Sequence, residues 1–257
     1  MISFMAVALE DFPLVKSDCD LTRIIVDTTR KNGLQFEDGD VVVIAQKIIS
    51  KAEKRMINLK EVVPSKRSKE IAEITGKSPK FVEMVLRETN RILKATRDIF
   101  LVEDKRGLVC INAGIDKSNV KGRENFALLP KNPDESARKC RSEIKKLTGK
   151  DVAVIVCDTY SRPFRRGQVN FAIGIAGIKP FKDYRTKKDL FGQILKVKNV
   201  AVVDEIAAAA ELVMGQAQEA TPVIILKGLS GVVEFCEECS ISELYISSEE
   251  DLFKNTL

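Results

Sequence analysis

The sequence predicts a mixed α/β fold (α+β in character) with two intermingled subdomains. Apolar runs typical of buried strands alternate with amphipathic helical patterns along most of the 257 residues. A hairpin pattern near residues 99–112 interrupts this alternation, which argues against a single doubly wound sheet. No Pro-, Gly- or Ser-rich linker marks a boundary. We therefore expect one unit of residues 1–257 made of interleaved subdomains, with an acidic, peripheral C-terminal segment from about residue 230.

The first half of the chain predicts three helices and a strand. Spacing of i, i+3, i+4 and i+7 predicts a short helix that Gly33 closes, with the apolar face Leu21, Ile24, Ile25 and Thr28. The turn 38–40 introduces a buried strand that ends at about Ala45. Two helices follow at about 64–75 and 79–96. The second helix is expected to present one apolar face, formed by Val82, Val85, Leu86 and Leu93.

The second half predicts a hairpin, a long helix and three more core segments. Residues 99–103 and 108–112 read as strands joined by the turn 105–107. Pro133 suits a first helical position and Gly149 a stop, so a helix is expected from Pro133 to about Leu147. The remaining segments are a buried strand at 152–157, a strand that passes into the Ala-rich helix of 195–215, and a last strand at 222–228.

Composition narrows the class of protein. The chain is 44% hydrophobic, and no run approaches the roughly 18 apolar residues of a membrane helix. Its N-terminus does not resemble a signal peptide, so we expect a cytoplasmic protein with no membrane partner. A net charge of +5 suits an anionic ligand. With 6% aromatic residues and no Trp there is no stacking platform, so we expect no nucleic-acid partner.

The chain contains no histidine, which excludes Ser-His and Cys-His nucleophiles and every His-based metal site. A metal must then be held mainly by oxygen, which favours magnesium or manganese. The six cysteines are expected to be reduced. Cys236 and Cys239 form an isolated CxxC without the second ligand pair of a zinc site, so we expect both thiols to pack in a C-terminal helix or loop.

One apparent nucleotide motif is misleading. Gly76-Lys77-Ser78 resembles the end of a P-loop, but a P-loop needs Gly about five residues before the Gly-Lys pair, and position 71 is Ile. The stretch also joins two expected helices instead of following a strand. We therefore interpret Gly76 as a helix cap.

Polar side chains follow three of the expected strands. Gln46, Lys47 and Lys51 come after the first; Asp116, Ser118 and Asn119 after the hairpin; Asp158 and Thr159 after 152–157. Each group alone has an ordinary explanation, because a Lys pair four apart is usually a solvated helix face and such an Asp usually a turn or helix cap. Taken together, two carboxylates, a hydroxyl and several cations indicate a site for a metal and phosphate.

Three arginines, Arg162, Arg165 and Arg166, follow Asp158 and Thr159 within seven positions. One interpretation is that they pair with surface acids. The other is that the planar guanidinium groups bind carboxylate or phosphate groups of substrates. We expect at least one of them to contact substrate.

Six segments, in the order that they have in the family, resemble the coenzyme F420-0:L-glutamate ligase, or gamma-glutamyl ligase, family. They cover most of the chain to about Gly228 and comprise residues 12–15, 38–55, 109–120, 157–177, 188–192 and 202–215. The resemblance implies GTP-dependent joining of L-glutamate to coenzyme F420-0 through an acyl phosphate, giving F420-1 and γ-linked F420-2. It also implies two divalent cations (Mg²⁺ or Mn²⁺), GTP as co-substrate, a role for K⁺, and an intertwined homodimer.

Three alternatives to this activity stay open. The same carboxylates suit a metal-dependent phosphohydrolase, a paralogous ligase with another acceptor is compatible with the same segments, and the basic residues suit a non-catalytic binder of anions. Dependence of GDP formation on glutamate separates the ligase from the phosphohydrolase.

The resemblance also assigns residues. Asp116 and Asp158 match metal ligands, and Thr159 matches a ligand of the second metal. With Arg162, Arg165 and Arg166, the two aspartates form the expected catalytic set. The nucleotide-binding set is Phe12, Pro13, Leu14, Val15, Gln46, Lys47, Lys51 and Asn119, with a loop that wraps the nucleotide: Met214, Gly215, Gln216, Ala217, Gln218, Glu219, Ala220 and Thr221.

Gln216 is a departure from the family pattern, which can place an acidic second-metal ligand directly after Met-Gly. An amide oxygen coordinates Mg²⁺ but contributes less charge. The second metal is therefore expected either to bind through Gln216 more weakly or to use Glu219 instead. Tyr160 and Ser161 also replace the Phe-Gly or Asn-Gly pair that often follows Asp-Thr.

Overall fold

The computed structural model describes residues 2–247 and 249–251 and divides the chain into two compact units. Unit 1 contains Met1–Ile49 and Asn132–Leu244. Unit 2 contains Ser50–Lys131 and the described residues from Tyr245. Each unit is therefore assembled from segments that are distant in sequence, and α2 (Gln46–Ala52) begins in the first and ends in the second.

Unit 1 is built on a five-stranded sheet with the order β1-β12-β2-β8-β9. Only the central pair, β2 and β8, is parallel; its neighbours pair antiparallel. The strand bounds are β1 Met5–Ala8, β2 Val41–Ala45, β8 Ala153–Ser161, β9 Gln168–Ala176 and β12 Val223–Lys227. Val41–Ile44 and Val223–Leu226 are buried because both faces of this sheet are covered.

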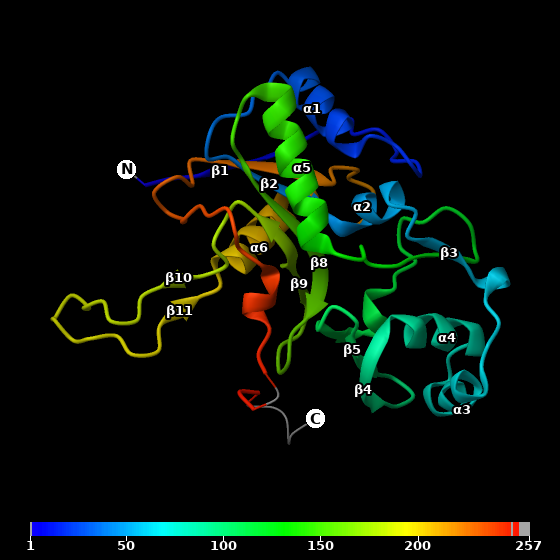
Figure 1. Ribbon diagram of the computed structural model, residues 1–257. Helices are drawn as coiled ribbons and strands as arrows, with labels where there is room; N and C mark the ends of the chain where they lie inside the picture. The colour runs from blue at the N-terminus through cyan, green and yellow to red at the C-terminus, as the bar shows by residue number, and fades with distance from the viewer. Residues whose placement is uncertain (1, 248, 252–257) are drawn as a thin grey trace. The chain divides into compact units, whose positions relative to one another are not determined.

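Helices α5 (Pro133–Thr148) and α6 (Val202–Met214) pack on the sheet of unit 1, with α5 in front of the strands in Figure 1. Asn132 caps the start of α5 by accepting from Glu135 N–H, and Gly149 ends it at φ 74°. Helix α1 (Leu21–Lys31) packs beside α5. The short strands β10 (Lys182–Asp183) and β11 (Asn199–Val200) frame an extended hairpin, seen at the left of Figure 1, and η3 spans Ile241–Leu244.

Strand β9 is an edge strand whose outward N–H groups are bound by carboxylates instead of another strand. Asn170 N–H donates to Glu211 Oε2 at 2.7 Å, and Ala172 N–H donates to Asp204 Oδ1 at 2.9 Å. Both acids belong to α6, two turns apart. A bulge opposite Val156 and Cys157 then shifts the alternation, and Ile175 N–H donates to Asp134 of α5 at 2.8 Å. The edge is thereby closed to further pairing.

Unit 2 combines two small sheets with a helical pair. Strands β4 (Thr89–Ala95), β5 (Phe100–Asp104) and β6 (Val109–Ile111) form one sheet, and β3 (Met56–Asn58) pairs with β7 (Asn125–Ala127). Helices α3 (Lys66–Thr75) and α4 (Pro79–Glu88) pack together, and η1 (Leu59–Glu61) and η2 (Asn112–Gly114) are single turns. The buried core of this unit consists of Val62, Ile71, Ala72, Val82, Met84, Val85, Phe100, Val102, Ala113, Ile115 and Leu128.

The mixed α/β class is confirmed, as are several individual elements. The predicted helix at 21–32, strand at 41–45, hairpin at 99–112, helix from Pro133 and strand at 222–228 are all present. Gly76 caps α3 at φ 66°, as expected for a helix stop. Among the described helices, none combines the length and apolar character that crossing a bilayer requires.

Three expectations were wrong. The helix expected to reach residue 96 ends at Glu88, because Thr89–Ala95 pairs with β5, so Leu93 does not share a helical face with Val82. Strand β8 does not stop at Cys157 but continues to Ser161 through pairing with β9. Cys236 and Cys239 are paired as a disulfide in a loop after β12, with their Cα atoms 6.2 Å apart, where we expected two reduced thiols.

Candidate functional site

In unit 1, Asp158 and Thr159 lie in the part of β8 that emerges from the buried core. Residues 153–157 are buried, and both site residues are partly exposed. Antiparallel register places Thr159 opposite Asn170 of β9. Thr159 Oγ1 and Asn170 Oδ1 are 3.1 Å apart. The pleat of a paired strand therefore sets the positions of these oxygens.

Gln216 reaches the same place from the loop after α6. Its Oε1 lies 3.1 Å from Thr159 Oγ1, and its Nε2 donates to Glu211 Oε1 at 2.6 Å. The loop leaves α6 at Gly215, whose φ of 68° favours glycine, and an added Cβ would displace the side chain of Glu219. Two predicted ligands of the second metal, Thr159 and Gln216, are thus in contact.

Glu219, the alternative to Gln216, is engaged within its own loop. Its carboxylate accepts from Ala217 N–H at 2.7 Å. Backbone N–H groups of Glu219 itself and of Ala217 hold the pKa of this carboxylate below its usual range. Thr221 Oγ1 fastens the other end of the loop by donating to Met214 O at 2.8 Å. Glu219 therefore acts on the shape of the loop.

Two carboxylates make the electrostatic potential near Thr159 more negative. Burial raises the pKa of the Cys157 thiol, and the negative charges of Asp158 and Glu211 raise it further. Both carboxylates therefore lie within electrostatic reach of one buried side chain. Such a field favours a bound cation.

The three arginines belong to the turn between β8 and β9, residues 162–167. In the described part of the chain none of the three forms an ion pair with an acid, which differs from the interpretation that they pair with surface carboxylates. Arg162 donates to Arg166 O at 3.4 Å, and its buried Nε meets no acceptor among the described residues. Guanidinium groups without carboxylate partners are available to anionic ligands.

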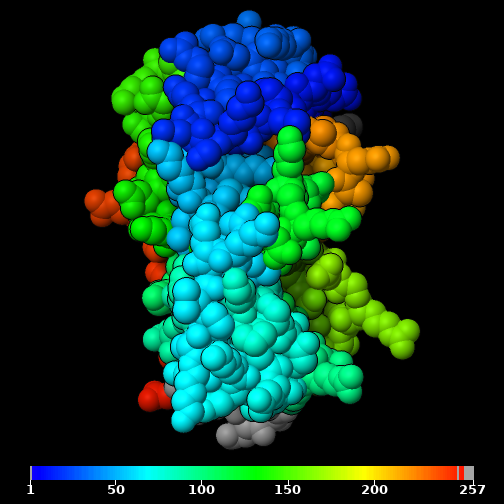
Figure 2. Space-filling view, turned by 90° about the vertical axis from the view of Figure 1, so that its right-hand side faces the viewer, coloured from blue at the N-terminus to red at the C-terminus, as the bar shows by residue number. Residues whose placement is uncertain are grey.

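The predicted nucleotide residues of unit 1 lie on three segments: 12–15, 46–47 and the loop 214–221 after α6. Phe12 is buried, whereas Pro13 and Leu14 are exposed in an irregular stretch after β1. Figure 2 shows the N-terminal residues, in deep blue, on the surface of the molecule. Gln46 and Lys47 begin α2 directly after β2; Gln46 is buried and Lys47 is partly exposed.

The predicted residues of unit 2 are Lys51, near the end of α2, and Asp116 and Asn119, in the segment 116–119. Asp116 accepts from Ser118 N–H at 2.8 Å and from Ser118 Oγ at 2.6 Å, which folds the segment into a tight turn. Lys51 Nζ donates to Asn119 O at 3.0 Å, so two residues expected to bind nucleotide are in contact. Asp116 itself bridges to Ala127 through backbone hydrogen bonds.

The backbone before Asp116 adopts an uncommon conformation. Asn112, Ala113 and Gly114 have φ values of 53°, 54° and 67°, and Asn119 has φ 53°. Left-handed conformations of Asn and Ala carry a steric cost, which surrounding packing must offset. Burial of Ala113 in the core of unit 2 provides that packing.

Metal-binding capacity depends on oxygen donors. In residues 2–247 and 249–251, no three side chains of His, Cys, Asp or Glu gather in a group suited to a metal. The oxygens near Thr159 come instead from a hydroxyl, two amides and one carboxylate. Analysis of the sequence missed Asn170 and Glu211. Glu211 had a signal in the sequence, since Asp204 and Glu211 are acids seven residues apart on a mostly apolar helix, whereas Asn170 had none.

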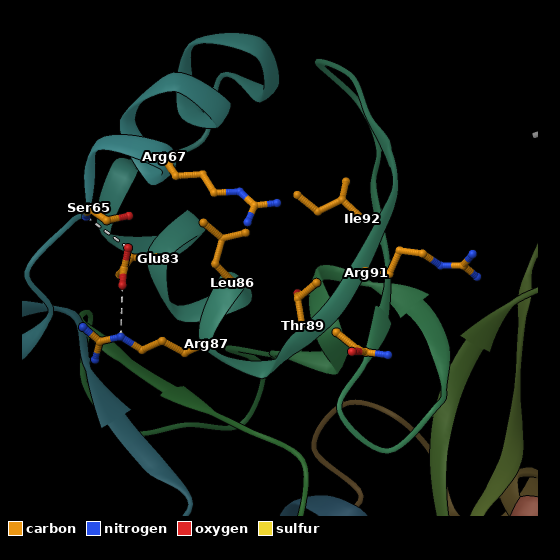
Figure 3. Close-up of a pocket in the computed structure, with 9 residues that line it drawn as sticks. Ser65, Arg67, Glu83, Leu86, Arg87, Thr89, Arg91 and Ile92 are labelled. Carbon is orange, nitrogen blue, oxygen red and sulfur yellow. Dashed lines mark hydrogen bonds and ion pairs between the residues drawn. The ribbon is translucent and has the colours of Figure 1, made fainter.

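A cavity of about 460 Å³ in unit 2 lies apart from the segments that carry predicted residues. Figure 3 shows its lining between α3, α4 and β4: Arg67 extends across Leu86 toward Ile92, and Glu83 accepts from both Ser65 and Arg87. No predicted site residue lines it. A second cavity of about 310 Å³ in unit 1 includes Arg141, which pairs with Asp151 and Glu237.

The chain is similar to known proteins over most of its length. The chain is 46% identical over 220 residues to the coenzyme F420:L-glutamate ligase of Methanocaldococcus jannaschii, covering 86% of each chain. Identity is 45% to that of Archaeoglobus fulgidus, over 97% of this chain and 96% of the relative, and 40% to that of Methanosarcina mazei, over 100% and 97%. The model of the F420-0:gamma-glutamyl ligase family matches residues 11–228, which include every predicted site residue. The chain therefore belongs to the F420-0:gamma-glutamyl ligase family.

Proposed function

We propose that this protein joins L-glutamate to coenzyme F420-0 in a reaction driven by GTP. The observation that carries the proposal is the family match over residues 11–228, because it contains Phe12, Thr221 and every predicted site residue between them. The relatives named coenzyme F420:L-glutamate ligase cover most of this chain at 37–46% identity. A second round that adds a γ-linked glutamate is part of the proposal.

The reaction proceeds in two transfers. The terminal carboxylate of F420-0 attacks the γ-phosphorus of GTP, the bond from the γ-phosphorus to the β–γ bridging oxygen breaks, and GDP leaves. The amine of glutamate then attacks the acyl carbon of the acyl phosphate and loses a proton, and phosphate leaves as the amide forms. The contribution of the protein is positioning and neutralisation of charge.

The donor set fits hard divalent cations, since the candidates Asp116, Asp158, Thr159 and Gln216 all present oxygen and the chain lacks histidine. Bound Mg²⁺ or Mn²⁺ would neutralise phosphate charge. Lys47 and Lys51 would add cationic contacts to the nucleotide, with Phe12–Val15, Gln46, Asn119 and the loop 214–221 around it. K⁺ is a further candidate ion for the same anionic ligands.

Arg162 is the best candidate among the arginines for contact with a substrate carboxylate or phosphate. Its Nε is buried, and no described residue accepts a hydrogen bond from it. A buried donor without an acceptor costs about 1–3 kcal/mol. An anionic substrate would remove that cost, whereas Arg165 and Arg166 are exposed and solvated.

The proposal is tested by incubating the protein with F420-0, L-glutamate, GTP and Mn²⁺. Chromatography measures GDP, and mass spectrometry measures the glutamylated F420 product. We expect one GDP for each glutamate added, and no GDP when glutamate is omitted. GDP released without glutamate would indicate a phosphohydrolase, and product formation with another amino acid would indicate a different acceptor. Ligand binding that persists in EDTA without turnover would indicate a non-catalytic binder.

We also propose a homodimer, in which the hairpin between β10 and β11 contacts a second copy. Backbone hydrogen bonds hold the hairpin in an extended form, for example Thr186 N–H to Leu195 O at 2.8 Å. Three of its apolar side chains are almost fully exposed: Leu190 (99%), Phe191 (88%) and Val197 (89%). Such a patch on a projecting segment is typical of an interface.

We propose the cytoplasm as the compartment, since the substrates are small soluble anions.

Light scattering coupled to size exclusion tests the dimer. Leu190→Ser with Phe191→Ser should convert it to monomer, and Leu212→Ser, at an exposed position of α6, serves as the control. A monomeric wild-type protein would contradict this part of the proposal.

A further inference from the structure

Three side-chain oxygens converge where β8, β9 and the loop after α6 meet in unit 1. Thr159 Oγ1 lies 3.1 Å from Asn170 Oδ1 and 3.1 Å from Gln216 Oε1. Asn170 is only 3% exposed, so water does not readily satisfy its amide. Each residue comes from a different element, so tertiary structure brings the three oxygens together and a single turn does not.

The two amide oxygens of this cluster share two hydrogen atoms, one from Thr159 Oγ1 and one from Gln216 Nε2, so lone pairs on these oxygens stay unoccupied. The Thr159 hydroxyl has one proton and two acceptors at the same distance. Gln216 Nε2 gives Asn170 Oδ1 a longer contact of 3.3 Å. The Asn170 amide nitrogen faces the sulfurs of Cys157, at 3.6 Å, and Met214, at 3.8 Å, so the oxygen is the atom directed into the cluster. Lone pairs in excess of protons suit a hard cation.

Glu211 stands behind this cluster and sets the orientation of Gln216. Its Oε1 accepts from Gln216 Nε2 at 2.6 Å, which turns the Gln216 oxygen toward Thr159. Its Oε2 accepts from Asn170 N–H at 2.7 Å, which fixes the strand that presents Asn170. One carboxylate therefore contacts two of the three oxygen donors. A hydrogen-bonded carboxylate behind a neutral ligand orients that ligand and increases its basicity.

We propose that the second divalent cation is held by Thr159, Gln216 and Asn170, and that Glu211 supplies the negative charge that Gln216 lacks. Asn170 is a ligand, and Glu211 is a positioning residue that acts through Gln216. The proposal rests on the proposed function for the presence of two cations. It explains how the site binds a cation with an amide at position 216. The negative charge is carried by Glu211, which accepts a hydrogen bond from Gln216.

Glu211 has an alternative role that must be separated from this one, because it also binds the edge of β9. Asp204 offers a matched control. It lies on the same helix, two turns away, and accepts from Ala172 N–H at 2.9 Å in the same way that Glu211 accepts from Asn170. No hydrogen bond joins Asp204 to Thr159, Gln216 or Asn170 among the described residues.

The experiment measures Mn²⁺ binding by electron paramagnetic resonance of the free ion, without nucleotide and again with a non-hydrolysable GTP analogue. Glu211→Gln should weaken the weaker of two Mn²⁺ sites by about tenfold or more, since a charged second-layer partner typically changes metal affinity 10- to 100-fold. Asn170→Ala should produce a similar loss. Asp204→Asn should leave both affinities unchanged, and thermal unfolding monitored by circular dichroism verifies that each variant is folded.

The proposal would be overturned by wild-type affinity for both ions in Glu211→Gln, or by an equal loss of affinity in Asp204→Asn. A single Mn²⁺ site in the wild type under both conditions would also overturn it. Since Mn²⁺ is counted without turnover, absence of ligase activity alongside the expected titration would refute the proposed function and leave this inference standing.

Discussion

The two units present their candidate ligands on different kinds of backbone. In unit 1, Asp158 and Thr159 belong to a regular strand paired residue by residue with β9. In unit 2, Asp116 follows a run of left-handed residues that includes the buried Ala113. The first arrangement fixes the ligands through register and carries no backbone strain. The second depends on core packing to hold a conformation that costs about 1–3 kcal/mol for each strained residue.

This contrast implies that the two positions should differ in how well they tolerate a longer acidic side chain. A side chain on a paired strand cannot shift without moving the strand, so added length displaces its carboxylate. A side chain in a turn has neighbours that adjust. The predictions below test this difference, beginning with the largest effect.

Removal of either carboxylate charge should lower ligase turnover by about 100-fold or more, because each balances polyphosphate charge in the reaction. We expect this for Asp158→Asn and Asp116→Asn, measured as GDP release, with the surface variant Asp27→Asn as control. Lengthening separates the units: Asp158→Glu should be as inactive as Asp158→Asn, whereas Asp116→Glu should recover part of the activity. Equal recovery at both positions would remove the distinction between strand and turn.

Gly174→Ala should destabilise the protein by about 3 kcal/mol, since an added methyl group would overlap the backbone of Pro133, which cannot move aside. Ala113→Gly in unit 2 should change stability by less than about 1 kcal/mol, because relief of the left-handed strain offsets the loss of a buried methyl. Urea unfolding followed by circular dichroism measures both. Gly33→Ala is the control without a clash, and a cost at Gly174 no greater than at Gly33 would contradict the prediction.

Arg162→Ala should raise KM for F420-0 or glutamate about tenfold while leaving Mn²⁺ affinity unchanged, since its role is to bind substrate. Arg67→Ala is the comparison in unit 2. Arg67 lines the cavity of Figure 3 and likewise forms no ion pair among the described residues, but it lies outside the predicted site. Wild-type kinetics for alanine variants of Arg162, Arg165 and Arg166 would make the cluster structural.

The smallest effect is a pH dependence of opposite sign in the two units. Burial would raise the pKa of Glu88 in unit 2, but Arg55 at 2.7 Å and Arg106 at 3.2 Å outweigh it, so the pKa lies below 4.5. Its stabilisation is present above pH 4.5 and is lost as the pH falls through the lowered value. Burial raises the pKa of Asp204 in unit 1 above 3.8, despite the bond from Ala172, so its contribution falls as the pH rises.

Unfolding free energies at pH 4.0 and 7.0 measure this difference. Glu88→Gln should lower the gain in stability from pH 4.0 to 7.0 by about 1 kcal/mol or less, and Asp204→Asn should increase it. If both variants changed this gain in stability in the same direction, the opposite pKa shifts assigned to Glu88 and Asp204 would be contradicted.

Local signals predicted much of the fold. Pro133 and Gly149 identified both ends of α5, and the spacing of Leu21 and Ile25 identified α1. The same signals failed at 89–95, where Arg91, Leu93 and Lys94 favour a helix but pairing with β5 decides the structure. No local pattern contains that information.

The site was predicted in the same uneven way. Asp158, Thr159 and Gln216 were identified from the family resemblance, and the structure places Thr159 and Gln216 together. Asn170 was missed because its position opposite Thr159 follows from the register of two strands, which the sequence does not state. Glu211 was missed because a helical acid is usually solvated, whereas this one is partly buried against β9.

The carboxylates along β9 have a consequence for solvent exchange. An edge strand ordinarily exposes its outward amides to water, and those amides exchange their hydrogens quickly. Here Asn170, Ala172 and Ile175 each donate to a carboxylate. In a hydrogen–deuterium exchange experiment these three amides should be protected like those of a central strand. Exchange rates alone would therefore not identify β9 as an edge strand.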